Sequence, residues 1–270
     1  MAGELRDLPN LRGRFPFRLG ATSYVIPADI VPNVRELAVK VDDVELVLFE
    51  SAETSNLPDA ETVGELRRLA AEHDLSYTVH LPLDARLGER DERARRRAVE
   101  KCLAVADCVR ALGPLAWTVH FDADGPGRPA PADARAWRAA LARSARELID
   151  SGIEPRRLCV ETLDYPFEAV EEVVAGLDLS ICLDVGHLLI SGRPLEAALV
   201  RYLPRCRVVH LHGVINGKDH ADLSGMPRAD LGLLVALLGA GGEPPRVVTL
   251  EVFSAADLAR SLAILGELAA

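Results

Sequence analysis

The chain contains few aromatic residues and no apolar run long enough to cross a membrane. Aromatic residues make up 4% of its 270 residues, whereas 49% are hydrophobic, so we expect a core built mostly of Leu, Val, Ile and Ala. The apolar stretch at 231–240 falls short of the roughly 20 residues that a membrane helix needs. The segment before Phe15 has no apolar stretch that could serve as a signal core. These absences predict a soluble, cytoplasmic protein without a membrane partner.

Paired cysteines are also missing. The five cysteines lie within apolar patterns and form no CxxC pair. An odd count without a secretory signal favours free thiols in a reducing compartment. These residues are Cys102, Cys108, Cys159, Cys182 and Cys206.

Positive charge is scarce, with 31 Lys and Arg against 41 Asp and Glu and a formal net charge of -10. Because nucleic-acid binding usually needs a basic face, we predict no nucleic-acid partner. A local phosphate site is still compatible with this balance, since a metal ion can supply the positive charge. The basic run at 89–97 interleaves acids at helical spacing, which favours a solvated helix face.

Short apolar runs alternate with helical patterns along the chain. Helices are expected over 60–74, 89–112, 132–151 and 166–176. The intervals between the apolar runs are long enough for one crossover helix each. No Ser-rich or Gly-rich linker divides the chain, and we interpret 125–133 as a loop on the active face. The apolar runs predict eight strands, at 17–24, 44–50, 75–80, 115–120, 157–161, 179–184, 207–212 and 246–251.

This pattern predicts an α/β fold of the (β/α)8 TIM-barrel class. The length is close to the roughly 250 residues typical of that barrel. We therefore expect a single catalytic domain over residues 16–270, preceded by an N-terminal extension over 1–15.

Histidines and carboxylates stand at the ends of most of these strands. Since the chemistry of a parallel barrel lies at the carboxyl ends of its strands, we expect these side chains to converge. In the segment DVGH, Gly186 would permit a sharp turn that lets both Asp184 and His187 face the mouth. His210 and His212 are two residues apart, so they point to the same side of a strand. The remaining strand-end residues are His80, His120, Glu161 and Glu251.

Imidazole and carboxylate ligands together suit Zn, Mn or Fe, and this many ligands would serve two or three divalent ions. One strand-end histidine alone is as well explained by a structural hydrogen bond. The whole set is not, because burying these charges without metal would cost several kcal/mol. Three further residues are ambiguous: Glu50 could reach the site or hold a loop, Arg86 could meet a phosphate or solvent, and His73 more simply caps a helix end.

The order of these residues is similar to that of the xylose isomerase-like barrel superfamily, and especially to its endonuclease IV branch, which cleaves phosphodiesters at a trinuclear zinc site. The resemblance spans most of residues 17–253. One departure is that Lys218 stands where that branch has an aspartate, so either Asp219 or Asp222 completes a third metal site or Lys218 replaces the charge of the third cation. The metal ligands that the resemblance implies are His80, His120, Glu161, Asp184, His187, His210, His220 and Glu251.

Other phrases resemble the cobamide-remodelling phosphodiesterases, which share this barrel. They lie at 17–34, 41–51, 56–59, 77–84 and 217–220, largely outside the ligands. The resemblance implies metal-assisted hydrolysis of the phosphodiester in the nucleotide loop of a cobamide, a cobalamin-type corrinoid, for exchange or salvage of the lower ligand.

On this interpretation Glu161, Glu251, Lys218 and Arg86 take part in catalysis. Substrate contacts are assigned to Tyr24, Glu50, His212 and Asp219.

Two other classes of function remain open. A sugar or sugar-phosphate isomerase or epimerase of the same superfamily would use one ion, with Glu161 and Glu251 moving a proton. A non-catalytic corrinoid-binding protein would bind cobamide without turnover. DNA repair is disfavoured by the acidic balance.

Overall fold

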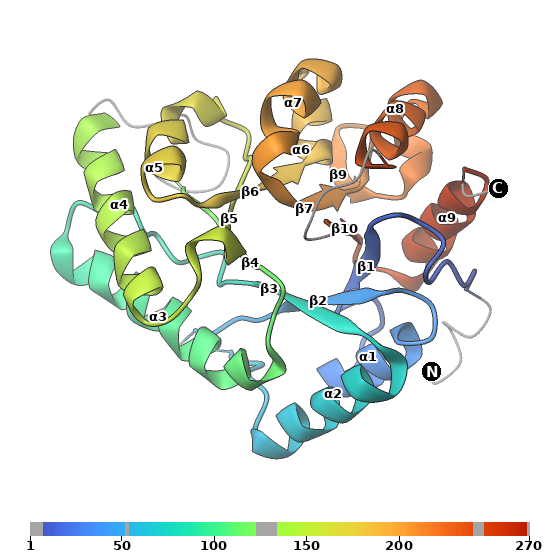
Figure 1. Cartoon of the computed structure of the whole chain (residues 1–270), viewed down its shortest axis with the longest axis horizontal. Helices are drawn as coiled ribbons and strands as arrows, with labels where there is room; N and C mark the ends of the chain where they lie inside the picture. Colours follow the sequence, from blue (N-terminus) through green and yellow to red (C-terminus); the bar gives the residue numbers. More distant parts are fainter. Residues whose placement is uncertain (1–7, 52–53, 123–133, 240–245, 269–270) are drawn as a thin grey trace.

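Eight parallel strands form a closed barrel with helices around it (Figure 1). The computed structural model describes residues 8–51, 54–122, 134–239 and 246–268. Around the barrel the strands follow the order β1, β10, β7, β6, β5, β4, β3, β2, so the predicted fold is confirmed. The barrel strands are β1 Arg18–Thr22, β2 Asp43–Val47, β3 Ser76–His80, β4 Trp117–Val119, β5 Leu158–Glu161, β6 Ser180–Asp184, β7 Cys206–Leu211 and β10 Val247–Leu250.

The predicted helices are present, and the structure adds elements that the sequence did not reveal. The expected helix at 166–176 is a short 3-10 turn, Phe167–Ala169, followed by α5. A hairpin of β8 Gly213–Ile215 and β9 Lys218–Ala221 follows β7. The helices are α1 Ile30–Leu37, α2 Ala60–His73, α3 Glu92–Val109, α4 Ala134–Asp150, α5 Glu171–Gly176, α6 Val185–Ile190, α7 Leu195–Tyr202, α8 Arg228–Gly239 and α9 Ala255–Gly266, and further 3-10 turns lie at Arg110–Leu112, Pro155–Arg157, Leu203–Arg205 and Leu223–Gly225.

The periphery agrees with several expectations from the sequence. No helix within the described ranges is both long and apolar enough to span a bilayer. All five cysteines are free, as predicted. Of the expected N-terminal extension, Leu8 and Leu11 pack into the hydrophobic core. The loop expected at 125–133 lies outside the described residues.

The barrel interior changes from small side chains to charged side chains along the strands. Cys159, Cys182 and Val208 form a small buried cluster with Ala116. Because alternate residues of a strand face the same side, the residues two positions further along three of these strands face the same interior. Those residues are Glu161, Asp184 and His210, all of them buried.

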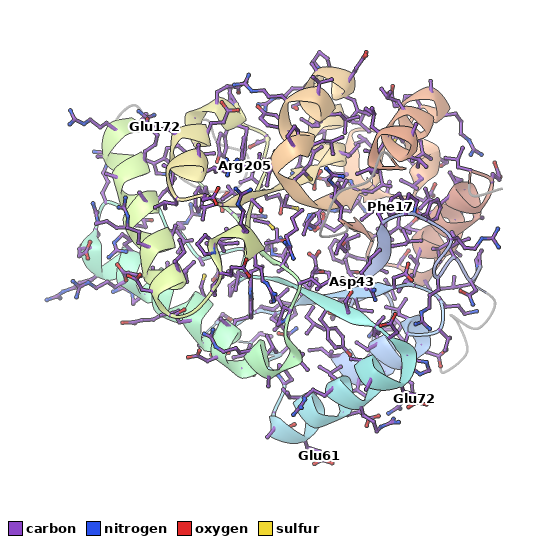
Figure 2. All side chains as sticks on the ribbon, viewed as in Figure 1. Phe17, Asp43, Glu61, Glu72, Glu172 and Arg205 are labelled. Carbon is purple, nitrogen blue, oxygen red and sulfur yellow. The ribbon has the colours of Figure 1, made fainter. Side chains whose placement is uncertain are left out.

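One carboxylate lies at the opposite, amino-terminal end of the barrel. Asp43 begins β2 and is completely buried; Figure 2 shows it well inside the ring of helices that carry Glu61, Glu72 and Glu172. It accepts hydrogen bonds from the hydroxyls of Ser76 and Thr78. Burial nevertheless raises its pKa to about 6, because an ionised carboxylate is poorly solvated there.

Replacing Asp43 with Asn should stabilise the protein above pH 6. The folded-state pKa lies above the ordinary value of 3.8, so ionisation between pH 4 and pH 6 destabilises the folded state, by up to about 3 kcal/mol. Asn resembles the neutral carboxyl group and avoids this loss. Urea unfolding should show Asp43→Asn more stable than the parent at pH 8 and nearly equal to it at pH 4. A difference that does not change with pH would contradict this account.

Candidate metal centre

Imidazole and carboxylate groups meet at the carboxyl end of the barrel, as the strand-end pattern predicts. His210 on β7 lies at the centre of this group. Its Nδ1 atom is 3.2 Å from Glu251 Oε2, 3.5 Å from Glu161 Oε2 and 3.9 Å from Asp184 Oδ2. Three carboxylates from three strands therefore surround one ring nitrogen.

The other side of His210 is held by Glu45, a residue that the sequence analysis did not select. His210 Nε2 donates to Glu45 Oε2 over 3.1 Å, and the Thr249 hydroxyl donates to the same oxygen. Both partners of this pair are fully buried. Since a carboxylate on Nε2 keeps a proton there, Nδ1 is the nitrogen that would bind a metal ion, on the side of the three carboxylates. The sequence signal that could have identified Glu45 is that it is an acidic residue inside the apolar run of the second strand.

This arrangement fits a cation. His210 Nδ1 and Glu251 Oε2 are both buried, and neither finds a hydrogen-bond partner among the described residues. Two acceptor atoms 3.2 Å apart repel one another unless a positive charge lies between them. Five buried carboxylates, Glu45, Asp122, Glu161, Asp184 and Glu251, share this end of the barrel, so their charge matches that of two or three divalent ions.

The two oxygens of Glu161 face different histidines. Oε2 lies 3.1 Å from His120 Nε2 and 3.2 Å from His80 Nε2. Oε1 lies 3.5 Å from His187 Nδ1. His80 is oriented by its own Nδ1, which donates to the Leu81 carbonyl over 2.8 Å. Glu161 can therefore bridge two groups of imidazole ligands.

The carboxylate of Glu161 and the histidines around it shift one another's pKa values. Burial opposes ionisation of this carboxylate, but His120 and His210 outweigh that effect and hold its pKa well below the usual value. Burial likewise opposes a charge on His120, yet Glu161 and Asp122 raise its pKa to about 10. Asp122 lies 3.7 Å from His120 Nδ1 and, like Glu45, was not selected from the sequence. The site as a whole favours positive charge beside its carboxylates.

Asp184 and His187 meet as predicted, but the reason given for Gly186 is wrong. The backbone passes directly from β6 into α6, and Asp184 caps that helix by accepting from the His187 N–H over 2.6 Å. Gly186 is helical rather than part of a special turn. It must be glycine because a Cβ there would collide with the His212 ring.

The hairpin β8–β9 carries His220 over the site. Its main-chain N–H donates to His212 Nδ1 over 2.9 Å, so the proton of His212 resides on Nε2, which lies 3.2 Å from Asp184 Oδ1. His212 is completely buried and orients Asp184. His220 has a positive φ of 50°, and its ring Nδ1 lies 3.2 Å from the Glu251 carbonyl.

The other predicted residues lie around this centre. Asp219 is half-buried beside His220, whereas Lys218 is exposed at the start of β9. Asp222 is bound to the Ser224 N–H and to Arg260. Arg86 and Glu50 are half-buried in the loops after β3 and β2, and Tyr24 is exposed after β1. The positions alone do not test the roles predicted for Lys218, Arg86, Glu50 and Tyr24, which stay predictions.

A cavity of about 490 Å³ opens above the carboxylates. His120, Glu161 and Glu251 form part of its floor. Its lining also includes three large apolar side chains that are 42–52% exposed, namely Leu83, Ile190 and Phe253. The ring of Phe253 packs edge-on against His220. Asp164 and Asp219 line the same cavity, so a ligand would reach the candidate metal-binding groups past both apolar and acidic side chains.

The sequence and the fold both relate this chain to known proteins. Residues 36–265 match the family model described as the xylose isomerase-like TIM barrel. The chain belongs to this family. No curated protein sequence matches the chain.

Members with solved structures share the fold at low sequence identity. A D-tagatose 3-epimerase-like protein aligns with a TM-score of 0.72 and 20% identity, covering 93% of this chain and 96% of its own. An L-ribulose 3-epimerase aligns with a TM-score of 0.68 and 18% identity, over 94% of each chain. Endonuclease IV from Thermus thermophilus aligns with a TM-score of 0.63 and 22% identity, over 93% of this chain and 99% of its own.

Replacing Glu45 with Gln should weaken metal binding about 10-fold to 100-fold, as is typical when the partner of a ligating histidine is lost. Gln keeps the shape but removes the charge that makes His210 a strong ligand. Glu61→Gln, an exposed change on α2, is the matched control. Titration of the metal-free variants with Zn²⁺ or Mn²⁺ would measure the affinity; equal affinities would contradict the role of Glu45.

Proposed function

We propose that this protein is a metal-dependent phosphodiesterase that hydrolyses the nucleotide-loop phosphodiester of cobamides. The observation that carries the proposal is the position of Glu161 between two groups of histidines, His80 and His120 on one oxygen and His187 on the other. An arrangement with ligands for more than one ion suits phosphoryl transfer, in which the attacking and leaving oxygens both need stabilisation.

The proposed ligands divide into a shared core and two flanks. Glu161, Asp184, His210 and Glu251 converge at the centre. His80 and His120 extend the site on one side, and His187 and His220 on the other. These residues also form overlapping groups whose donor atoms lie within 4.8 Å of one another. When bound, the ions would polarise the phosphoryl oxygens and acidify water.

The chain's own residues would orient and enclose the reacting groups. Glu45, Asp122 and His212 hold His210, His120 and Asp184 in place, which fixes the ligands before substrate binds. Leu83, Ile190 and Phe253 line the mouth of the cavity and would limit access of bulk water, which strengthens electrostatic interactions inside.

A sugar epimerase is the second candidate. It is favoured by the structural similarity to the D-tagatose 3-epimerase-like protein and by Glu161 and Glu251, which come from different strands and both approach His210. Two such carboxylates could remove and return a proton on a carbon next to a carbonyl group. The additional histidines on both flanks are not needed for that reaction.

Incubation with adenosylcobalamin should release the nucleoside of the lower ligand and leave a phosphorylated cobinamide. The purified protein would be loaded anaerobically with Fe, Mn or Zn in turn, and the products identified by mass spectrometry. An unchanged corrinoid with every metal would refute the proposed activity. Conversion of a ketose in a parallel panel of sugars would instead support the epimerase.

Replacing Glu161 with Gln should reduce hydrolysis at least 100-fold and lower the number of ions bound, because the bridging charge is lost. The change keeps the side-chain volume but leaves His80 and His120 without their carboxylate partner, which costs stability, so circular dichroism would verify the fold. Activity and metal content per chain would be measured together. Full turnover with full metal content in Glu161→Gln would show that this carboxylate does not organise the site.

A further inference from the structure

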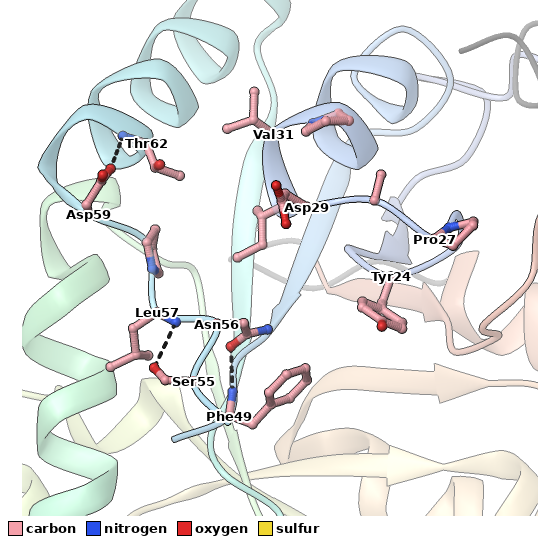
Figure 3. Close-up of a pocket in the computed structure, with 14 residues that line it drawn as sticks. Tyr24, Pro27, Asp29, Val31, Phe49, Ser55, Asn56, Leu57, Asp59 and Thr62 are labelled. Carbon is pink, nitrogen blue, oxygen red and sulfur yellow. Dashed lines mark hydrogen bonds between the residues drawn. The ribbon is translucent and has the colours of Figure 1, made fainter. Parts of the chain in front are cut away.

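A second cavity, of about 740 Å³, opens beside the metal centre and is not used by the proposed reaction. It is a groove between α1 and the start of α2, formed by the loops that follow β1 and β2 (Figure 3). Tyr24 and Phe49 lie at one end of it and pack edge-on, with ring centroids 6.4 Å apart. Most of the remaining lining is apolar: Pro27, Ala28, Ile30, Val31, Pro32, Leu57 and Pro58.

The groove and the metal cavity are each lined by a residue that follows one of two neighbouring strands. β1 pairs with β10 in parallel, with Ala21 opposite Leu250, and the Thr22 hydroxyl donates to the Val252 carbonyl over 2.9 Å. Tyr24 and Phe253 each follow three residues later on these paired strands. Tyr24 is 49% exposed and lines the groove, and Phe253 is 43% exposed and lines the metal cavity. Two exposed aromatic side chains, one from each cavity, therefore follow a pair of adjacent strands.

The groove is suited to a neutral, largely apolar ligand. Its Asn56 amide is already bound to the main chain at Val47 and Phe49, and Asp59 caps α2 by accepting from the Thr62 N–H. Among the described residues that line the groove, none is Lys or Arg. The exposed carboxylate of Asp29 would repel an anion and attract a hydrogen-bond donor.

The sizes of the two cavities bear on the class of substrate. A monosaccharide fits within the 490 Å³ metal cavity alone. Such a substrate would leave the larger groove unoccupied. A substrate with an apolar body attached to a phosphodiester would use both spaces. Its charged group would enter the polar cavity, and its body would lie across Tyr24 and Phe253.

We propose that the groove formed by Tyr24, Phe49, α1 and the start of α2 binds an edge of the corrin ring while the phosphodiester is at the metal centre. This inference rests on the proposed function and adds the location of the substrate body. The edge of the corrin ring carries methyl groups, which suit the apolar lining, and amide side chains, whose N–H groups can donate hydrogen bonds to Asp29.

Cobinamide, which lacks the nucleotide, tests the groove separately from hydrolysis. Equilibrium dialysis with the metal-loaded protein should show binding. Tyr24→Ala should weaken that binding about tenfold through loss of an aromatic contact surface. Ala28→Trp, which fills the groove without removing a contact, should weaken it as well. Val200→Ala, a 70% exposed position on α7, is the control, and circular dichroism would verify folding of each variant.

Kinetics would link the groove to turnover. In Tyr24→Ala, KM for adenosylcobalamin should rise more than KM for bis(p-nitrophenyl) phosphate, a small diester that needs only the metal cavity. Equal rises in both would overturn the proposal, as would a parent protein that does not retain cobinamide or groove variants that bind it normally.

The two proposals fail separately. Cobinamide binding that depends on the groove, without hydrolysis of any diester, would refute the phosphodiesterase and preserve the binding site. Hydrolysis of adenosylcobalamin that neither groove variant changes would support the phosphodiesterase and refute the groove as a binding site.

Discussion

The burial of five carboxylates at one end of a closed barrel is the constraint on which the rest of this structure depends. Glu45, Asp122, Glu161, Asp184 and Glu251 are each at most 6% exposed. A buried carboxylate without a counter-charge is costly, so every one of them requires a cationic or hydrogen-bonding partner. The histidines supply part of that compensation, and a bound cation would supply the remainder.

The histidines differ in role because their second ring nitrogens have different partners. Glu45 holds Nε2 of His210, and a carbonyl holds Nδ1 of His80. Each of these contacts leaves the opposite nitrogen directed at the shared carboxylates. His212 is used differently, since the His220 main chain and Asp184 engage both of its nitrogens. Ligand and support are thus distinguished by contacts that the residue type does not reveal.

Apolar side chains surround the candidate metal centre. An apolar mouth of Leu83, Ile190 and Phe253 lies above a highly polar floor. An apolar groove lined by Tyr24 opens on the loop after the neighbouring strand β1. In the proposed function, the reacting bond of the substrate lies over the polar floor and its body lies toward this groove. The proposed function also agrees with the acidic balance of the chain, which is unfavourable for a polyanion.

The sequence by itself determined the barrel and most of the residues that converge at the candidate metal centre. Apolar runs that end in His, Asp or Glu are a local pattern, and the carboxyl ends of parallel strands must meet, so His80, His120, Glu161, Asp184, His210 and Glu251 could be brought together without coordinates. The hairpin β8–β9 and helices α1, α6 and α7 were missed because their segments are short, and α8 because its apolar residues lack a strong period. Helix α9 has a regular apolar period and could have been predicted. Only the tertiary structure decided the role of Glu45, whose partner His210 lies on another strand, and that of Asp122, which turns back toward His120 two residues earlier. Glu45 lies within an apolar run. Its carboxylate contacts His210, which is 165 residues away in the sequence and lies across the barrel interior. Likewise, the need for Gly186 arises from the approach of the His212 ring, a contact that no local pattern encodes.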